Sequence, residues 1–274
     1  MQAAIRSLIL LALCLTLFAC AKQERTLPTL PDASLAVETW GRFHNISERA
    51  EHTAGPFSIN ATLYYAGKEG SQRVTAYVWG NGQPEAPLPL RLDILLGPGS
   101  VLASAAEETR GTFIYVPRDN MVYHTTNVGL AEFGVPLPFS LASLTAILTG
   151  RYAEVFKPAK NTQNTAFAAV NGKDNTLIFP ISDAPLAGKL TLSRDGLPVA
   201  WSEEADDGWR ISLEYWPDST RTTPRKLSIK HGSTAAEATL IMRELTFPQK
   251  PFRNEQLRLN VPPNTRLAPL AVAL

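Results

Sequence analysis

Cysteine and histidine are scarce in this chain of 274 residues, which has two cysteines and four histidines. Cys14 and Cys20 both lie within the first twenty residues, so the remainder of the chain holds no pair that would form a disulfide. No two histidines have the spacing of metal ligands, and the sequence has no His-Glu-x-x-His motif. We therefore expect no bound metal and no cofactor. The histidines are His44, His52, His124 and His231.

Catalytic and nucleic-acid-binding signals are also missing. The sequence has no Gly-x-Ser-x-Gly turn and no phosphate-binding loop. Neighbouring carboxylates on a strand point to opposite faces, so Glu107-Glu108 and the acidic run around Glu203 are interpreted as solvated charges at turns or sheet edges rather than catalytic pairs. Basic and acidic residues number 26 and 25, which gives no positive excess for binding nucleic acid. An enzyme is therefore not expected.

The N-terminus carries a short apolar run instead of a membrane span. Arg6 is the only charge before it, and residues 7–19 contain only Ser7 and Thr16 as polar residues. A bilayer-spanning helix needs roughly 20 apolar residues, so this run is typical of a cleaved signal peptide, residues 1–19. The segment Leu17-Phe18-Ala19-Cys20 matches the lipobox of bacterial lipoproteins, in which Cys20 becomes the acylated first residue. An ordinary signal cleaved elsewhere is the alternative.

Acylation would fix the location of the mature protein. Each buried CH₂ of an acyl chain contributes ~0.8 kcal/mol, so a tri-acylated Cys20 would anchor the protein permanently in a membrane. Ala21 and Lys22 follow the cysteine, and the absence of aspartate there predicts the outer membrane of a Gram-negative bacterium, facing the periplasm. Residues 20–33 form the expected lipidated N-terminus and mobile tether, 34–264 one domain, and 265–274 a C-terminal tail.

Alternating hydrophobicity dominates the domain. A helix is expected first, from the spacing of Leu35, Trp40, Phe43 and Ile46, before Gly55-Pro56. Strands with turns every eight to twelve residues follow, and the clearest alternation is Leu88–Leu96. This pattern predicts a mainly β (α+β) protein with about eleven strands in a strongly curved antiparallel sheet or incomplete barrel. Leu257, Leu259 and Val261 predict the last strand. The five tryptophans are expected in packing rather than in a glycan site.

One short helix interrupts the strands. Ser140 is a candidate N-cap, and Gly150 is expected to end the helix. Leu141, Leu144 and Leu148 share one face of it, with Ile147 beside them. A single helix of this length has too little surface to form a layer of its own, so we expect it to cover an opening of the sheet.

These features resemble the LolA/LolB lipoprotein-localisation superfamily, and within it the lipid-anchored outer-membrane receptors. Three of them carry the resemblance: the lipidated Cys20, the helix before the strand that opens at Phe57, and the segment Gly134-Val135-Pro136-Leu137-Pro138 before the short helix. The resemblance covers residues 34–261. It implies an incomplete β-barrel with a helical lid over a hydrophobic cavity, where acyl chains such as palmitate are held in transit.

The resemblance also implies roles for individual residues. Leu141, Leu144 and Leu148 would be lid residues, and Leu90, Leu92 and Ile94 would line the cavity wall. The loop Gly97-Pro98-Gly99 departs from the receptors because its tip has no leucine. The resemblance therefore leaves open whether this loop supports the membrane-insertion step, while the binding step is still implied.

Two functions follow from these observations. The first is a monomeric carrier or receptor, anchored through Cys20, that takes lipoprotein or other lipid cargo from a periplasmic LolA-like carrier and passes it to the membrane. The alternative is a non-enzymatic interaction lipoprotein that docks an envelope complex and fills its interior with its own side chains. Strand alternation is the same for a cavity wall and a filled core, so the sequence leaves both open.

Overall fold

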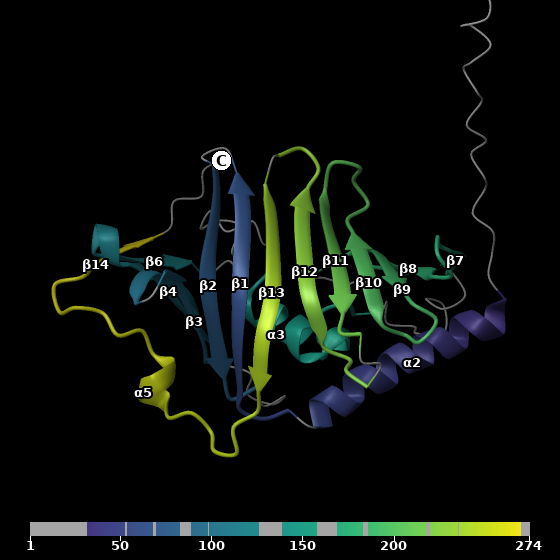
Figure 1. The fold of residues 1–274 in the computed structure, drawn as a ribbon, viewed down its shortest axis with the longest axis horizontal. Coiled ribbons are helices and arrows are strands. Elements are labelled where there is room, and N and C mark those ends of the chain that lie inside the picture. Colours follow the sequence, from purple (N-terminus) through teal and green to yellow (C-terminus); the bar gives the residue numbers. More distant parts are fainter. Residues whose placement is uncertain are drawn as a thin grey trace, which may run out of the picture.

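The computed structural model describes residues 32–269, apart from 53, 68–69, 83–88, 98, 126–138, 158–168, 183–185, 218–219 and 235. The expected signal peptide, Cys20 and the segment Gly134-Val135-Pro136-Leu137-Pro138 lie outside the described residues. The described part contains one sheet of fourteen strands, in the spatial order β14-β6-β5-β4-β3-β2-β1-β13-β12-β11-β10-β9-β8-β7 (Figure 1). The strands are β1 (Phe57–Gly67), β2 (Gly70–Gly80), β3 (Leu90–Leu96), β4 (Ser100–Glu108), β5 (Gly111–Val116), β6 (Met121–Thr125), β7 (Val170–Asn171), β8 (Leu177–Ile181), β9 (Gly188–Leu192), β10 (Pro198–Ser202), β11 (Trp209–Tyr215), β12 (Pro224–His231), β13 (Glu237–Thr246) and β14 (Arg266–Pro269).

The sheet consists of two meanders joined in the middle. β1 to β6 run outward in one direction, and β7 to β13 return from the opposite edge, so that β1 pairs with β13. This central antiparallel pair runs from Ser58↔Thr246 to Ala66↔Glu237 and contains an irregularity between Asn60 and Ala61. Adjacent strands are antiparallel apart from β14, which pairs with β6 in parallel.

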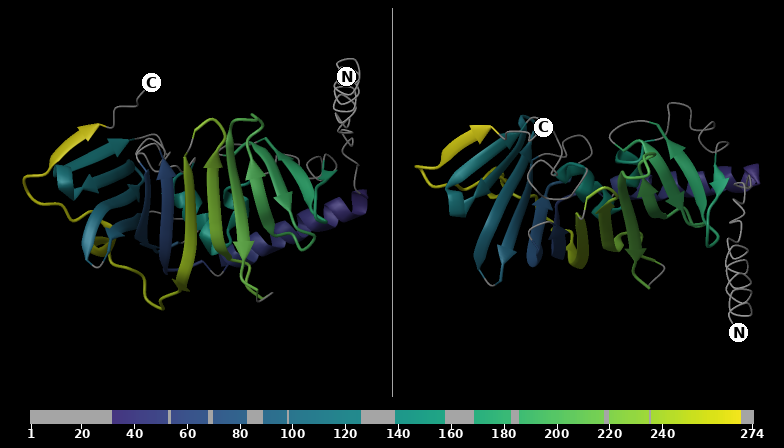
Figure 2. Two further views of the ribbon diagram at one scale, coloured as in Figure 1. Left: turned by 45° about the horizontal axis from the view of Figure 1, so that its top comes forward. Right: turned by 90° about the horizontal axis from the view of Figure 1, so that it is seen from above.

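The sheet is strongly curved, and the helices lie inside the curve. Seen from above, it forms an open trough that contains α3 (Leu141–Thr149) and has α2 (Ala33–His52) on the same side (Figure 2). We call this helix-covered side the inner face and the opposite side the outer face. The predicted fold class, a curved antiparallel sheet with few helices, is confirmed, although the sheet has fourteen strands where about eleven were expected.

The predicted N-terminal helix is confirmed as α2. Asp32 caps it, because its side-chain oxygen accepts a hydrogen bond from the Ser34 amide at 2.9 Å. Trp40 and Phe43 are buried, and the Trp40 ring stacks on Phe179 of β8 with 5.0 Å between the ring centroids. The apolar face of α2 therefore packs on the half of the sheet that contains β8 to β11.

The C-terminal segment corrects one prediction. Leu257, Leu259 and Val261 were expected to form a strand, but Asn254–Leu257 is the short helix α5 and 258–265 is irregular. Outer-face side chains of β2 and β3 bind this segment: the Trp79 indole donates to the Gln256 carbonyl at 3.1 Å, and Arg91 donates to the Arg258 carbonyl at 2.9 Å. The described residues then end in β14, within the segment expected as a tail.

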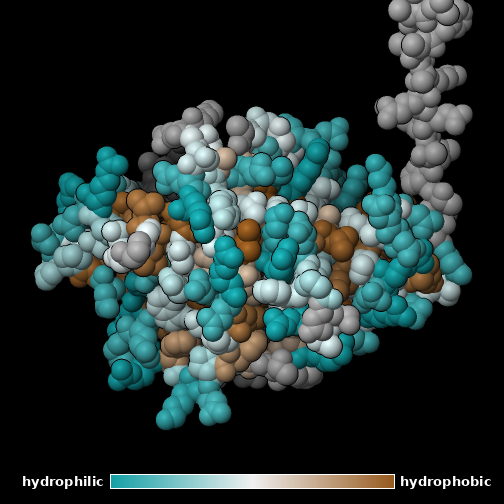
Figure 3. Space-filling view, in the orientation of Figure 1, coloured by the Kyte–Doolittle hydropathy of each residue, from teal (hydrophilic) through white to brown (hydrophobic). Residues whose placement is uncertain are grey.

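The outer face differs from the inner face in composition. In the view of Figure 1, which places α3 behind the strands, the molecular surface is mostly hydrophilic with smaller hydrophobic groups between (Figure 3). The inner face, in contrast, contributes almost entirely apolar side chains to one core cluster with α2 and α3. The candidate site therefore lies on the inner face.

Candidate functional site

The predicted wall residues lie on one strand and on the inner face. Leu90 and Leu92 of β3 are buried, and Ile94 is partly buried and packs against the same core. They alternate with Arg91 and Asp93, which lie on the outer face and form an ion pair at 2.8 Å. The alternation read from the sequence therefore places this strand with its apolar side toward α3.

The predicted lid residues lie on α3. Leu141, Leu144 and Leu148 are 0 to 2% exposed, and seven of the nine residues of the helix are buried. Ser140 caps the helix as expected, because its hydroxyl accepts a hydrogen bond from the Ser143 amide at 3.0 Å. Gly150 ends the helix in the left-handed conformation, with φ of 87°. α3 thus lies against the inner face and is almost completely buried.

The structure brings together three of the six predicted residues. Leu144 of α3 faces Leu92 and Ile94 across a void of about 20 Å³ that is lined only by apolar side chains. Leu90, Leu141 and Leu148 do not line this void. A volume of about 10–15 Å³ is needed to hold one water molecule, so the void is far too small for an acyl chain. The remaining lining residues are Leu63, Ala76, Val78, Leu227, Ile229, Ala238 and Leu240.

A buried carboxylate at the start of α3 was missed by the sequence analysis. Glu107 was interpreted as a solvated charge, but it is 5% exposed and lies on the inner face of β4. Its Oε2 accepts a hydrogen bond from the Ala142 amide at 3.1 Å, and the Leu141 amide also donates to this carboxylate. Burial raises the pKa of the Glu107 carboxyl, and the two amides lower it in part. The alternation of β4 was the available signal, because Glu107 is in phase with Ala105.

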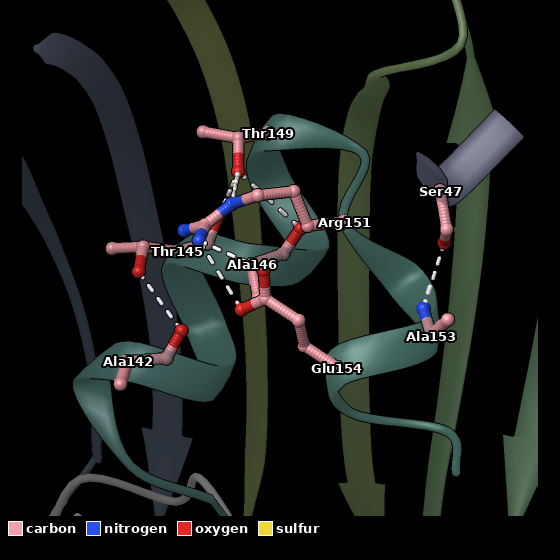
Figure 4. A network of polar contacts seen from close by, with 8 residues as sticks. All are labelled: Ser47, Ala142, Thr145, Ala146, Thr149, Arg151, Ala153 and Glu154. Atoms are coloured by element: carbon pink, nitrogen blue, oxygen red, sulfur yellow. Dashed lines mark hydrogen bonds and ion pairs between the residues drawn. The ribbon is translucent and has the colours of Figure 1, made fainter. Parts of the chain in front are cut away.

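A polar network holds the end of α3 (Figure 4). Thr149 donates to the Thr145 carbonyl at 2.7 Å and accepts from Arg151 Nε at 3.1 Å. Arg151, which is 3% exposed, also forms an ion pair with Glu154 at 2.9 Å. The Ala153 amide donates to the Ser47 hydroxyl of α2 at 2.7 Å. The helix end is therefore connected to the turn after it and to a second element of the fold.

Larger hollows lie away from the void, and two of them border elements described above. One is a cleft of about 310 Å³ beside this network, bordered by Phe57, Thr149 and Arg151. The other is an outer-face groove of about 360 Å³ between β4 to β6 and the C-terminal segment, bordered by Phe113, Val122 and Leu259 among others. Neither was predicted, because both depend on contacts between segments that are far apart in the sequence.

The histidines are dispersed over the part of the chain that the structure describes. His44 is packed edge-on against Trp40, and burial lowers its pKa, while its Nε2 has no hydrogen-bond partner. His124 lies against Phe113, and His231 contacts Ser233. The side chain of His52 lies outside the described residues. Among the residues that the structure covers, no three His, Cys, Asp or Glu side chains form a group that would hold a metal ion.

The β3–β4 turn carries exposed apolar side chains at its flanks. Gly97 and Gly99 have positive φ of 68° and 87°, and Pro98 lies outside the described residues. Leu96 is 53% exposed, and Val101 and Leu102 are 41% and 36% exposed. No helix within the described ranges is both long enough and apolar enough to cross a membrane.

The fold is similar to that of several bacterial proteins. A LolA superfamily protein from Nitrosomonas europaea superposes with a TM-score of 0.53 at 10% identity, over 79% of this chain and 97% of that one. A domain named for outer-membrane lipoprotein sorting, from Vibrio parahaemolyticus, gives 0.51 at 9% identity over 81% and 97% of the two chains. A DUF1329-family protein from Desulfovibrio piger gives 0.52 at 8% identity over 81% and 99%. The sequence matches no family model and no curated protein. The chain therefore shares its fold with LolA-superfamily and lipoprotein-sorting proteins.

Proposed function

We propose that this protein is a non-enzymatic, LolB-like lipoprotein receptor of the outer membrane, anchored through Cys20, that binds acyl chains between α3 and the inner face of the sheet. The observation that carries the proposal is the inner face itself: a curved apolar wall covered by one short helix. The cargo would be a lipoprotein or another acylated lipid, delivered by a LolA-like carrier. The similarity in fold to lipoprotein-sorting proteins supports this choice.

The burial energy of an acyl chain can be compared with that of the three predicted lid leucines of α3. Returning the side chains of Leu141, Leu144 and Leu148 to water costs about 1.5–3 kcal/mol each, or roughly 5–9 kcal/mol together. Burying an acyl chain of about 16 carbons contributes on the order of 12 kcal/mol. Because the void holds only about 20 Å³, an acyl chain enters only if α3 moves away from β3. Measured from water, the gain from burying one acyl chain exceeds the cost of exposing these three leucines.

Release to the membrane would use the apolar flanks of the β3–β4 turn. Leu96, Val101 and Leu102 are exposed beside the wall strand β3. They provide apolar contact with a bilayer near the cavity, although the turn has no leucine at its tip. This places the proposed exit of the cargo at the end of the strand that lines the cavity.

One observation favours the alternative function, an interaction lipoprotein with a filled interior. α3 is buried on nearly all sides and leaves a void of about 20 Å³, as in a permanent core. In that case α3 would remain in place, and the protein would dock an envelope complex through its outer face or a sheet edge.

Native mass spectrometry distinguishes the two functions. Residues 20–274 carrying Cys20→Ser, which removes the acylation site, are exported behind a cleavable signal peptide and purified from the periplasm without detergent. Co-purifying lipid, or an acylated peptide that a fluorescent fatty acid displaces, would support the receptor. A bare protein mass together with no uptake of the fatty acid would refute the receptor and favour the alternative.

Replacing Leu144 with aspartate is a second test. Leu144→Asp puts a carboxylate opposite Leu92 and Ile94, so a receptor loses fatty-acid uptake because an acyl chain bound there would lie against a charge, while the sheet keeps its hydrogen-exchange protection. In the alternative function the same change destabilises the whole core. The matched control is Leu267→Asp, since Leu267 is 70% exposed on β14. An intact variant that still takes up fatty acid would overturn the assignment of α3 as the lid.

A further inference from the structure

The first turn of α3 is attached to the sheet by one side chain. The amides of Leu141 and Ala142 donate to the carboxylate of Glu107, and the Ser143 amide is satisfied within the segment by Ser140. Among the described residues, Glu107 provides the hydrogen bonds that join this turn to the sheet. The first backbone amides of a helix have no acceptor within that helix. The acceptor that they find outside it, here Glu107, therefore determines whether the first turn stays against the sheet.

The turn that directly follows α3, Tyr152–Glu154, is attached at several points. The Tyr152 hydroxyl donates to the Thr222 carbonyl, just before β12, at 2.5 Å. The Ala153 amide donates to Ser47 of α2 at 2.7 Å, and Arg151 joins Thr149 to Glu154. These contacts reach two elements far away in the sequence. The end of α3 is therefore fixed to the frame of the fold.

From this asymmetry we propose that Glu107 is the latch of α3, and that α3 opens by swinging its first turn away from β4 while the segment around Gly150 acts as the pivot. The inference rests on the proposed function, which requires α3 to move. Glu107 is a positioning residue in this scheme: it holds the helix and is not itself expected to contact the cargo.

The position of the latch connects it with the cavity wall. Glu107 pairs in register with Leu90 at the start of β3, the strand that also carries Leu92 and Ile94. Releasing the first turn from Glu107 uncovers that strand first. The hinge geometry thus opens the side of the trough on which the predicted wall residues lie.

The latch acts by accepting hydrogen bonds, and this makes it testable with paired variants. Glu107→Ala removes the acceptor, whereas Glu107→Gln keeps an oxygen at the same place. Glu108→Ala is the matched control, because Glu108 is the neighbouring carboxylate on the outer face, beside the groove. Each change is made in the mature protein, residues 20–274 carrying Cys20→Ser.

Hydrogen exchange of the backbone amides is the measurement. We expect Glu107→Ala to speed exchange of the Leu141–Ser143 amides by about 10-fold, while exchange in residues 152–156 and in β1 and β13 stays unchanged. Glu107→Gln and Glu108→Ala should leave the first turn within about twofold of the parent. Equal acceleration at both ends of α3, or none in Glu107→Ala, would overturn the proposal. If Glu107→Ala does not fold, Ser140→Ala tests the same end: it should loosen the first turn alone.

Fatty-acid uptake separates this inference from the proposed function. If both hold, Glu107→Ala takes up a fluorescent fatty acid faster than Glu107→Gln does. If the first turn loosens in Glu107→Ala but neither variant takes up fatty acid, the latch proposal is supported and the receptor function is refuted. Uptake by the parent with equal rates in both variants would keep the receptor and refute the latch.

Discussion

The two ends of α3 are held in different ways. At its start, the carboxylate of Glu107 accepts from two backbone amides. At its end, Arg151, Tyr152 and Ala153 make contacts with Glu154, Thr222 and Ser47. The comparison shows that a helix can be almost completely buried while different numbers of polar contacts join its two ends to the rest of the fold. Burial alone therefore does not decide whether a helix is a fixed core element or a lid.

The largest expected effect comes from breaking the fixed end. Arg151→Met leaves Glu154 without its partner, and because Arg151 is nearly fully buried we expect a loss of about 2–4 kcal/mol in the free energy of unfolding. Urea denaturation measures it as a lower midpoint at an unchanged slope. The double variant Arg151→Met/Glu154→Gln is the control and should recover part of the loss. A loss below about 0.5 kcal/mol would mean that the end is held by apolar packing instead.

A smaller effect is expected from Tyr152→Phe. The change removes the hydroxyl that donates to the Thr222 carbonyl and should lower the free energy of unfolding by about 1–1.5 kcal/mol. Exchange of the Ala153 amide should accelerate, while the Ala142 amide at the other end stays protected. Acceleration at Ala142 of the same size would contradict independent attachment of the two ends.

The smallest effect concerns pH and the latch. Burial raises the pKa of Glu107 in the folded state, so the stabilisation that comes from its bound proton, separate from the hydrogen bonds that it accepts, is fully present below the ordinary value of 4.5. It is lost as the pH rises through the raised pKa, with a slope of at most about 1.4 kcal/mol per pH unit. The free energy of unfolding of the parent relative to Glu107→Gln should therefore fall as the pH increases above 4.5. A constant difference in urea titrations from acid to neutral pH would contradict the burial of this carboxylate.

Local signals in the sequence predicted the elements that short-range physics determines. Ser140 and Gly150 predicted both ends of α3, and the period-two pattern of Leu90 and Leu92 predicted the inner face of β3. These predictions succeeded because a cap, a left-handed glycine and a strand face depend on neighbouring residues.

Long-range contacts account for what the sequence did not predict. Glu107 and Glu108 are the same residue type side by side; the alternation of β4 indicates which one lies on the inner face, but its burial depends on α3, which covers that face. The apolar alternation of Leu257 and Leu259 resembles a strand, but the carbonyls of 256 and 258 bind Trp79 and Arg91, which lie far away in the sequence. Whether the interior is filled or hollow also could not be predicted from the sequence, because a cavity wall and a core strand have the same alternating pattern.

The pairing of β1 with β13 also has a consequence for how the chain folds. Ser58 and Thr246 are 188 residues apart, so β1 lacks its second neighbour until nearly the whole domain has been synthesised. Contacts of such high sequence separation slow folding, and a long unpaired strand edge promotes association with other chains. The two meanders are able to form early from local hairpins, but the closing step at the centre comes last. The period before that step is when this protein has the greatest need of a chaperone.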